Sequence, residues 1–369
     1  MMHISRRLKS VLISIYTLYK IPDVQEYPMA ISRVKNITIT GIVSVLPKQI
    51  RVNVDGTSGT KRQEVERIVD STGIHSLRVA SPEQTSLDLG FIACKNLLKK
   101  MKWSVDDISL IIFVTQTPDY PLPGNAVQLQ HKLGLNKGVL AFDVNLGCSG
   151  FVYGLWQVSQ LLSGLSGSKA LLIVGDTTTQ QYSATNHTVS LLFGDAASAV
   201  AIEKSLGCDD MVFSMGSDGA GAPYLIQPNG GAKNKSLAPE IFMDGLQVFV
   251  FTLREIPQSI AECLTEKGWS IDSLDYCVMH QANKMMLQKI AKKLGLSEEQ
   301  LIISMAEVGN TSSASIPLAL CISLSSALTE RENRLLFSGF GVGWSWGTVA
   351  LKLNKLKTCQ IIDMAKFDD

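Results

Sequence analysis

Apolar residues occur along the chain in short runs that alternate with stretches of helical periodicity. Four β-branched and aliphatic runs predict buried strands, at residues 36–47, 108–117, 138–144 and 168–178. Apolar residues at intervals of three and four predict amphipathic helices at residues 85–101, 125–135 and 243–268. Apolar strands that alternate with helices are typical of layered α/β proteins whose sheets are covered on both faces. The pattern therefore predicts an α/β fold of this kind.

Part of this pattern occurs twice. The segment from Trp103 to Val114 matches the segment from Trp269 to His280. Two copies at so long a period indicate a duplicated domain, because solenoid repeats are much shorter. Equivalent strand ends of the two halves can then meet near a pseudo-twofold axis, which brings residues distant in sequence into one site. We expect an N-terminal extension at 1–33, a first half at 34–205, a bridging segment at 206–240, a second half at 241–357 and a C-terminal tail at 358–369.

The composition is that of a globular intracellular protein. Of the 369 residues, 46% are hydrophobic and 18% are charged, which suits two domains or one large duplicated domain. The net charge of +1 gives no indication of a nucleic-acid-binding protein. The seven cysteines are scattered, odd in number and never spaced as a CxxC pair. We therefore expect no disulfide framework, no zinc site and a cytoplasmic location.

The first 28 residues resemble a signal peptide only in part. Basic residues precede a short apolar run at 11–19, but the run contains Ser and Thr, and no small-residue cleavage site follows it. We interpret the segment as a poorly ordered extension, or as the product of an upstream start codon with Met29 as the alternative start. A weak membrane-surface segment is a further alternative. No stretch of the sequence is long and apolar enough to suggest a membrane span.

Cys148 lies where a predicted strand meets a predicted helix. The strand at 138–144 ends just before it, and apolar residues at helical spacing follow at 151–162. At this position the free N–H groups and the positive dipole end of the helix favour a thiolate. Gly147 and Gly150 would let a substrate carbonyl approach the sulfur. The turn makes Cys148 a candidate nucleophile; the alternative is a cysteine that packs as a small core residue.

Two polar residues of the second half occupy comparable positions. His280 ends a predicted buried strand, and Asn310 lies at what we expect to be another strand-to-helix turn, where the hydroxyl residues at 311–313 would cap the helix. Taken singly, a satisfied core histidine and a helix-capping asparagine are the alternatives. The repeat, however, puts Cys148 close to the position equivalent to Asn310. Three chemically useful side chains at equivalent strand ends favour one shared site.

Four motifs carry a resemblance to a known family: NLGCSGF, HQAN, GNTSSASIP and GFGVGWSWG, which begin at residues 145, 280, 309 and 339. Their order resembles that of the ketoacyl synthase III family over residues 36–355. The resemblance implies a thiolase-like fold, in which duplicated halves form a layered αβαβα sandwich. It also implies the activity of a 3-oxoacyl-[acyl-carrier-protein] synthase III. The family's catalytic triad falls on Cys148, His280 and Asn310.

The resemblance implies a two-stage reaction. An acyl thioester acylates Cys148 and releases its carrier thiol. Malonyl-acyl carrier protein then loses carbon dioxide, and His280 Nε2 and the Asn310 amide donate to the enolate oxygen. The carbanion attacks the acyl-cysteine in a Claisen condensation, while the backbone N–H groups of Cys148 and Val342 stabilise the oxyanion. No metal or bound cofactor is implied, and thioesters of coenzyme A or acyl carrier protein are the substrates.

The resemblance assigns further residues outside the triad. It puts Gly341 and Gly343 at the substrate, and Leu122 where a side chain of the partner subunit of a homodimer reaches the acyl pocket. It also puts three lysines where an acidic acyl carrier protein docks: Lys289, Lys292 and Lys293. A turn residue at Leu122 and a solvated helix face for the lysines are the structural alternatives.

Other family positions differ in this chain. The Trp and Arg that contact the coenzyme A nucleotide are absent near residues 71–74, and Leu246, Val250 and Met285 replace polar or basic residues. The nature of the acyl donor and of the pathway, primary or specialised, therefore stays open. The alternative function is a pathway-specific acyltransferase that passes the acyl group from Cys148 to an alcohol or amine. A cysteine hydrolase is a further alternative; the intact triad argues against a non-catalytic partner subunit, and the lack of a second Cys in 339–347 argues against a thiolase.

Overall fold

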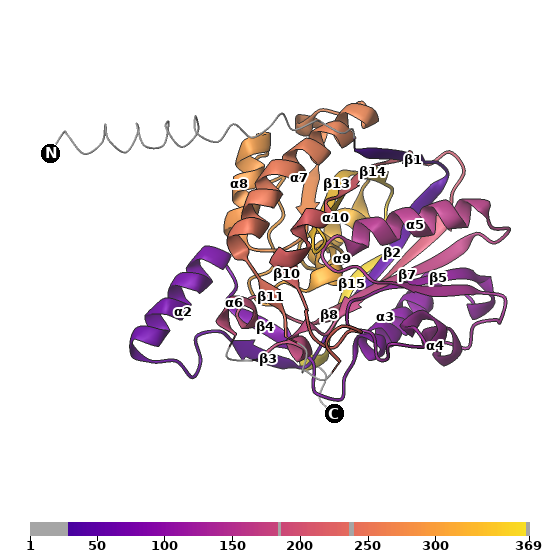
Figure 1. Cartoon of the computed structure of the whole chain (residues 1–369). Helices are drawn as coiled ribbons and strands as arrows, with labels where there is room; N and C mark the ends of the chain where they lie inside the picture. Colours follow the sequence, from indigo (N-terminus) through magenta and orange to yellow (C-terminus); the bar gives the residue numbers. More distant parts are fainter. Residues whose placement is uncertain (1–28, 184–185, 236–239, 367–369) are drawn as a thin grey trace.

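Two large β-sheets, with helices between them and outside them, form the body of the molecule, and two small sheets, each of two strands, accompany them (Figure 1). The computed structural model describes residues 29–183, 186–235 and 240–366. The layers follow one another as helix, sheet, helix, sheet and helix, so the predicted α/β sandwich is confirmed. The extension predicted for residues 1–28 lies outside the described residues.

The first sheet has six strands. In spatial order they are β15 (Thr358–Asp363), β2 (Ile37–Leu46), β8 (Ala196–Lys204), β7 (Lys169–Asp176), β5 (Ile108–Val114) and β6 (Leu140–Val144). β8 runs antiparallel to both of its neighbours, and the other pairs are parallel. Successive residues of β5 alternate between the two cores that cover the sheet, which is why the strand is a continuous apolar run.

The second sheet has five strands. In spatial order they are β1 (Ala30–Val34), β9 (Met211–Ser217), β14 (Ser345–Leu353), β13 (Asn333–Gly341) and β12 (Tyr276–Met279). The parallel pair β12 and β13 repeats the parallel pair β5 and β7 of the first sheet. These are the strands that the internal repeat in the sequence predicted to be equivalent, so the duplication is present in the fold.

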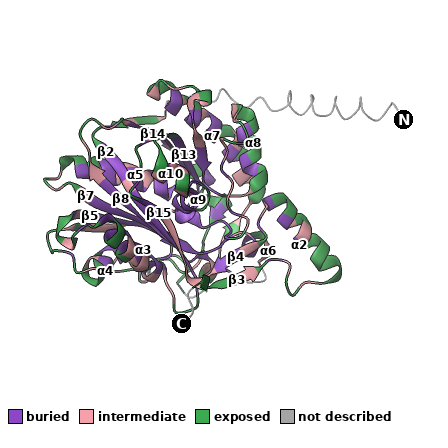
Figure 2. Cartoon of the chain, turned by 180° about the vertical axis from the view of Figure 1, so that it is seen from behind, coloured by how far each residue is buried: buried purple, intermediate pink, exposed green. Residues whose placement is uncertain are grey.

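Three helical layers cover the sheets. The central layer holds α5 (Gly150–Gly164) and α9 (Ser315–Ser323), which pack against both sheets. The outer layers hold α3 (Ser86–Met101) and α4 (Asn125–Lys132) on the first sheet, and α7 (Gly245–Lys267) and α8 (Lys284–Leu294) on the second. Figure 2 shows the buried residues concentrated along the sheets and on the inner faces of these helices. The central helices bring the start of α5 and the start of α9 to the middle of the molecule.

Three strands cross the boundaries expected from the sequence. β1 falls within the expected extension and β15 within the expected tail, yet both add to sheets. β9, in the expected bridging segment, is a central strand of the second sheet. The sequence around these three strands is rich in glycine or in charged residues. This composition resembles that of connecting segments. Their partners lie far away in sequence, which is information that a local pattern lacks.

The remaining α-helices and β-strands of the described residues are short or lie outside the two large sheets. They are β3 (Gln49–Val52), α2 (Gly59–Thr72), β4 (Ser76–Val79), α6 (His187–Ser190), β10 (Leu225–Ile226), β11 (Phe242–Met243) and α10 (Ser325–Glu330). Among the helices of the described residues, none has the length and apolar character needed to cross a membrane.

Candidate active site

Cys148 sits in the turn between β6 and α5, two residues before the helix begins. Strand β13 of the other half closes over this turn. A Cβ atom added at Gly341 would lie 2.6 Å from Cβ of Cys148 and 3.2 Å from its sulfur. Only glycine at that position lets the strand approach the thiol so closely. The duplicated halves therefore meet at the cysteine, as the sequence predicted.

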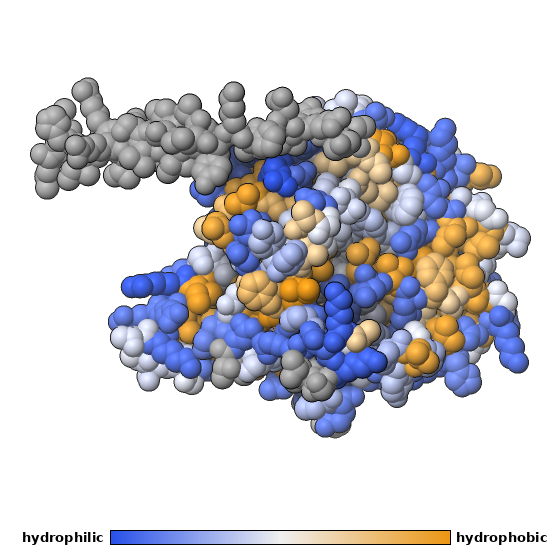
Figure 3. Space-filling model, in the orientation of Figure 1, coloured by the Kyte–Doolittle hydropathy of each residue, from blue (hydrophilic) through white to orange (hydrophobic). Residues whose placement is uncertain are grey.

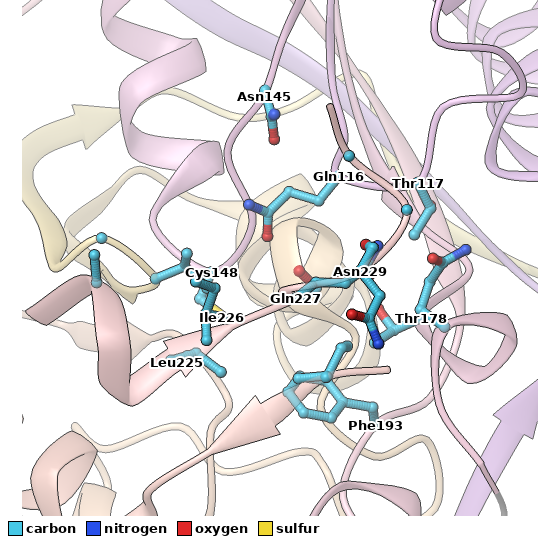
Figure 4. A pocket seen from close by; sticks show the side chains of 18 residues that line it. Gln116, Thr117, Asn145, Cys148, Thr178, Phe193, Leu225, Ile226, Gln227 and Asn229 are labelled. Carbon is cyan, nitrogen blue, oxygen red and sulfur yellow. The ribbon is translucent and has the colours of Figure 1, made fainter. Parts of the chain in front are cut away.

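The thiol faces a cavity of about 420 Å³ (Figure 4). Its wall includes Val342 and Gly343 from the turn between β13 and β14, and Ser312 from the segment before α9. The cysteine turn and the glycine-rich turn are tied together, because the Ser149 and Ser345 hydroxyls lie 2.7 Å apart. Cys148 itself is only 8% exposed, and it forms part of the wall of this cavity.

His280 follows the last residue of β12 and is buried. Its backbone N–H donates to the carbonyl of Ser338 on β13, and its Nδ1 atom lies 2.7 Å from the hydroxyl oxygen of Ser315. The ring of Phe340 stands edge-on to the imidazole, with 5.6 Å between the ring centroids. His280 thus sits on the strand that neighbours β13, whose glycines contact Cys148.

Asn310 is held by the segment of the first half that follows α6. Its backbone N–H donates to the carbonyl of Leu192, and its own carbonyl accepts from the N–H of Gly194. The expected strand before Asn310 is wrong: residues 302–309 form loops and turns, and Asn310 makes only an isolated bridge to Phe193. This segment is positioned by contacts across the halves, so it does not need a strand of its own.

The expected capping by residues 311–313 is also wrong. The side-chain oxygen of Asn310 accepts a hydrogen bond of 2.9 Å from the N–H of Ser312, which leaves the amide NH₂ of Asn310 as a donor. Ser312 has a positive φ of 49°, which is strained for a residue with a side chain. The Ser312 side chain hydrogen-bonds the sulfur of Cys148. Ser312 therefore connects Asn310 to the cysteine.

Burial is the main cause of the pKa shifts of Cys148 and His280. It raises the pKa of the Cys148 thiol to about 12, and the negative charge of Asp176 adds to this effect. The pKa of the Cys148 thiol is therefore raised, which is opposite to the direction expected from its place at a helix N-terminus. Burial also lowers the pKa of His280 to about 3, so its imidazole is neutral at physiological pH.

Asp176 links three segments beneath the cysteine. Its carboxylate accepts hydrogen bonds from the backbone N–H of Gln116, at 2.7 Å, and from the hydroxyls of Thr115 and Ser313. These contacts join the ends of β5 and β7 to the segment that carries Asn310. Sequence reasoning missed Asp176, Ser312 and Ser315 as site residues. The available signal was that Asp176 lies near the end of the strand predicted at 168–178 and that both serines lie in the GNTSSASIP motif.

Of the predicted site residues, Cys148, Val342 and Gly343 line the cavity, whereas His280, Asn310, Gly341, Leu122 and the three lysines of α8 do not. Leu122 is 82% exposed and precedes α4 on the outer surface. The three lysines predicted to dock a carrier protein, Lys289, Lys292 and Lys293, are exposed on α8. Lys293 already donates to the carbonyl of Leu253. Among the described residues, no cluster of three or more His, Cys, Asp or Glu side chains could hold a metal ion.

Comparison with known families agrees with this arrangement. The sequence model of the C-terminal domain of 3-oxoacyl-[acyl-carrier-protein (ACP)] synthase III matches residues 264–353, and that of 3-oxoacyl-[acyl-carrier-protein (ACP)] synthase III matches residues 142–229. Beta-ketoacyl-[acyl-carrier-protein] synthase III of Neisseria gonorrhoeae is 34% identical over 315 residues, which cover 85% of this chain and 98% of that protein. The chain belongs to the 3-oxoacyl-[acyl-carrier-protein] synthase III family.

Solved structures of synthase III proteins are similar along nearly their whole length. The 3-oxoacyl-(acyl-carrier protein) synthase of Burkholderia xenovorans LB400 is 36% identical, with a TM-score of 0.87 over 91% of this chain and 99% of that chain. The priming β-ketosynthase of the R1128 polyketide biosynthetic pathway is 26% identical, with a TM-score of 0.78 over 90% and 99%. As a synthase III family member the chain is an acyltransferase of thiolase-like fold.

Proposed function

We propose that the protein is a decarboxylating condensing enzyme in which Cys148 carries the acyl group. The observation that carries the proposal is the position of Cys148. Its thiol opens onto a cavity at the meeting point of the two halves, beside the turn that holds Val342. A cysteine with an apolar helix behind it and a substrate-sized cavity in front of it is suited to forming a thioester.

Acylation in this proposal starts from a neutral thiol. The sulfur attacks the thioester carbonyl, and the bond between that carbonyl and the carrier sulfur breaks. The thiol proton goes to the departing carrier thiolate, so no net charge is left in the buried site. A nucleophile whose pKa is raised by burial and by Asp176 loses its proton only as the new carbon–sulfur bond forms. The N–H groups of Cys148 and Val342 are the proposed donors to the oxyanion.

Condensation in this proposal depends on two neutral donors. Malonyl thioester loses carbon dioxide, and the electron pair of the broken carbon–carbon bond forms an enolate. His280 is buried and neutral, and Asn310 has its amide NH₂ left over after its oxygen accepts from Ser312. Neutral donors stabilise the enolate oxygen without protonating the carbanion. The carbanion then attacks the acyl-cysteine, forms the new carbon–carbon bond and expels the Cys148 thiolate, which takes a proton from water and returns to the neutral thiol.

The proposal includes acyl carrier protein as a partner, docked at the exposed lysines of α8. Acidic carrier proteins are attracted to such a surface. The exposed apolar side chains of Leu246, Val250 and Met285 on α7 and α8 add hydrophobic contact area beside these lysines. Carrier-bound and coenzyme A thioesters are the proposed substrates, with no bound cofactor. The seven cysteines are free thiols, which supports a reducing cytoplasmic location.

A homodimer is also part of the proposal. Strand β6 is the last strand of its sheet and leaves one edge without a partner in the described chain. Exposed apolar side chains surround this edge: Tyr120, Leu122, Val127, Leu140 and Leu161. Figure 3 shows hydrophobic surface gathered over the part of the visible face where Figure 1 labels α5, β7 and β5. A second copy would cover this surface, and Leu122 would then be able to reach the partner's cavity.

The test is intact mass spectrometry of the protein with a panel of acyl thioesters, followed by malonyl-acyl carrier protein. We expect a stable acyl adduct that Cys148→Ala abolishes, then discharge to a 3-oxoacyl product with release of carbon dioxide. Asn310→Asp keeps an oxygen to accept from Ser312 but removes the NH₂ donor. It should therefore load normally and condense poorly. Loading of wild-type protein without condensation would contradict the proposal and favour acyl transfer to an alcohol or amine.

A further inference from the structure

The wall of the cavity in front of Cys148 is mostly apolar, but it contains a group of polar side chains. Five side-chain amides line it: Gln116, Asn145, Gln181, Gln227 and Asn229. Hydroxyl groups of Thr117, Thr178 and Ser312 add to them. Apolar side chains, among them Leu225, Ile226 and Phe193, cover the remainder (Figure 4). A plain hydrocarbon chain would remove water from these amides and give them no hydrogen bond in return, which is unfavourable.

The protein itself provides almost no hydrogen-bond partners for these amides. In the part of the chain that the structure describes, the side chains of Gln116, Asn145, Gln181 and Asn229 make no hydrogen bond to a protein group. Gln227 makes a single one, to the carbonyl of Asn229.

A glutamine outside the cavity behaves differently. The NH₂ group of Gln281 donates to the carbonyls of Met279 and Ile302, and its oxygen accepts from the N–H of Ser304. The amides of the cavity therefore keep their hydrogen-bonding capacity for a ligand.

Gln116 packs beside the turn that carries Cys148. A Cβ atom added at Gly147 would lie 2.3 Å from Oε1 of Gln116, so the amide packs directly against the residue before Cys148. The backbone of Gln116 is fixed by its hydrogen bond to Asp176. In Figure 4 the Gln116 amide points into the cavity on the same side as Gln227. A glycine at 147 and a glutamine at 116 thus form a polar position within reach of the first carbons of a Cys148-bound acyl group.

The wall also defines the charge of what it can hold. None of the cavity-lining residues carries a charged side chain. A carboxylate or an ammonium group inside it would have no counter-charge, which disfavours charged substituents. A primary amide offers one acceptor and two donors, so it can bond either a hydroxyl or a carbonyl oxygen.

We propose that the acyl group loaded onto Cys148 carries an uncharged hydroxyl or carbonyl oxygen near its thioester end, and that Gln116 selects for it. The inference rests on the proposed acylation of Cys148 and names its substrate class. A site built to hydrogen-bond a substrate oxygen discriminates against the analogue that lacks it, because its own polar groups are then left unpaired. Gln116 acts as a specificity-determining residue and takes no part in bond making.

The experiment compares donors of equal chain length. Butanoyl and 3-hydroxybutanoyl groups are each presented on acyl carrier protein and on coenzyme A, and the acylation rate of Cys148 is measured by intact mass. A succinyl thioester tests the charged case. We expect the hydroxyacyl donor to load about tenfold faster than the butanoyl donor on the same carrier. The succinyl donor should load most slowly.

Variants locate the effect. Gln116→Met has nearly the same volume without the amide, and it should bring the two rates to within about twofold by slowing only the hydroxyacyl donor. Asn145→Leu is the second cavity variant, in case Gln116→Met is poorly folded. The control is Gln49→Met, the same change of residue type at an exposed position of β3. It should keep the wild-type ratio of the hydroxyacyl to the butanoyl loading rate. Thermal unfolding of each variant checks that it is folded.

Each outcome decides between two claims. If wild-type protein loads butanoyl at least as fast as 3-hydroxybutanoyl, acylation of Cys148 stands and the assignment of the substrate class is wrong. If both folded cavity variants keep the wild-type ratio, the assignment is also wrong. If none of the donors loads Cys148, the proposed function itself fails and the inference falls with it.

Discussion

The Nδ1 atom of His280 and the hydroxyl oxygen of Ser315 lie 2.7 Å apart, and both residues are buried. When the hydroxyl donates to Nδ1, the single hydrogen of the neutral imidazole is on Nε2. That is the tautomer which can donate to an enolate oxygen. Ser315 is therefore a positioning residue for His280, although it does not line the cavity in front of Cys148.

Replacing Ser315 tests this relationship. Ser315→Ala should lower the rate of malonyl decarboxylation about tenfold, since the loss of one buried hydrogen bond disturbs the tautomer and orientation of His280. Acylation of Cys148, followed by intact mass, should change little. Ser315→Thr keeps the hydroxyl and should restore decarboxylation. Equal losses in both half-reactions would mean that Ser315 serves only the packing of the site.

The buried histidine should make the protein sensitive to acid. Burial lowers the pKa of His280 to about 3, below its ordinary value of 6.5. Between these values the unfolded chain binds a proton at this side chain that the folded chain does not, so stability is lost as the pH falls through that window. The free energy of unfolding should decrease by up to about 1.4 kcal/mol per pH unit from this group. Urea unfolding at several pH values should show a smaller slope for His280→Gln, and an unchanged slope would contradict the burial argument.

The thiol of Cys148 should react slowly with an alkylating reagent at neutral pH. Its pKa is raised to about 12 by burial and by the charge of Asp176. The rate of carboxamidomethylation, mapped to Cys148 by peptide mass, should therefore keep rising about tenfold per pH unit up to pH ~10 without a plateau. Asp176→Asn removes the negative charge and should speed the reaction at each pH. A plateau below pH 9 in the wild-type protein would show a thiolate in the resting state.

Gly341 should tolerate no side chain. A Cβ atom there would lie 2.6 Å from Cβ of Cys148, and the contact is between two packed segments. Gly341→Ala is expected to lower stability by about 1–3 kcal/mol and to suppress acylation of Cys148. Gly164→Ala, at the end of α5 with no atom within 4 Å of its added Cβ, is the matched control. Chemical denaturation and intact mass measure the two effects, and wild-type behaviour of Gly341→Ala would refute the close approach of β13.

The lysines of α8 should affect the carrier protein but not the chemistry. Reversing Lys289 and Lys292 to Glu is expected to raise the KM for malonyl-acyl carrier protein about tenfold at low salt and to leave kcat unchanged. The KM for malonyl-coenzyme A should change little, because coenzyme A does not need a protein docking face. Lys99→Glu and Lys100→Glu, on the exposed end of α3, provide the control. Equal effects on both malonyl donors would argue against docking at α8.

Much of the central site could be predicted from the sequence. Cys148 and His280 lie at strand ends because apolar runs end just before them, and the internal repeat indicated that the halves meet there. The pKa of Cys148 could not be predicted, because it depends on its burial and on Asp176, which is close only in the folded chain. The local pattern also misjudged the segment before Asn310. That segment is fixed by hydrogen bonds to Leu192 and Gly194 rather than by a sheet.

Two strands at the edges of the sheets were also not predicted from the sequence. β1 and β15 are short and contain polar residues, so their local pattern resembles that of chain ends. Their pairing with β9 and β2 depends on contacts between residues that are distant in sequence. The amides of the cavity wall could not be predicted either, since they come from four separate segments that only the fold brings together.

The place of β15 beside β2 has a consequence for how the protein is made. β2 begins at residue 37 and β15 at residue 358, so the ribosome synthesises β2 early in translation and β15 near its end. At ~5–20 residues per second, translation leaves that edge of β2 waiting for on the order of tens of seconds. An open strand edge can pair with other nascent chains during this interval. Chaperones that bind nascent chains should therefore raise the yield of this protein more than the yield of a synthase whose first sheet is completed early in translation.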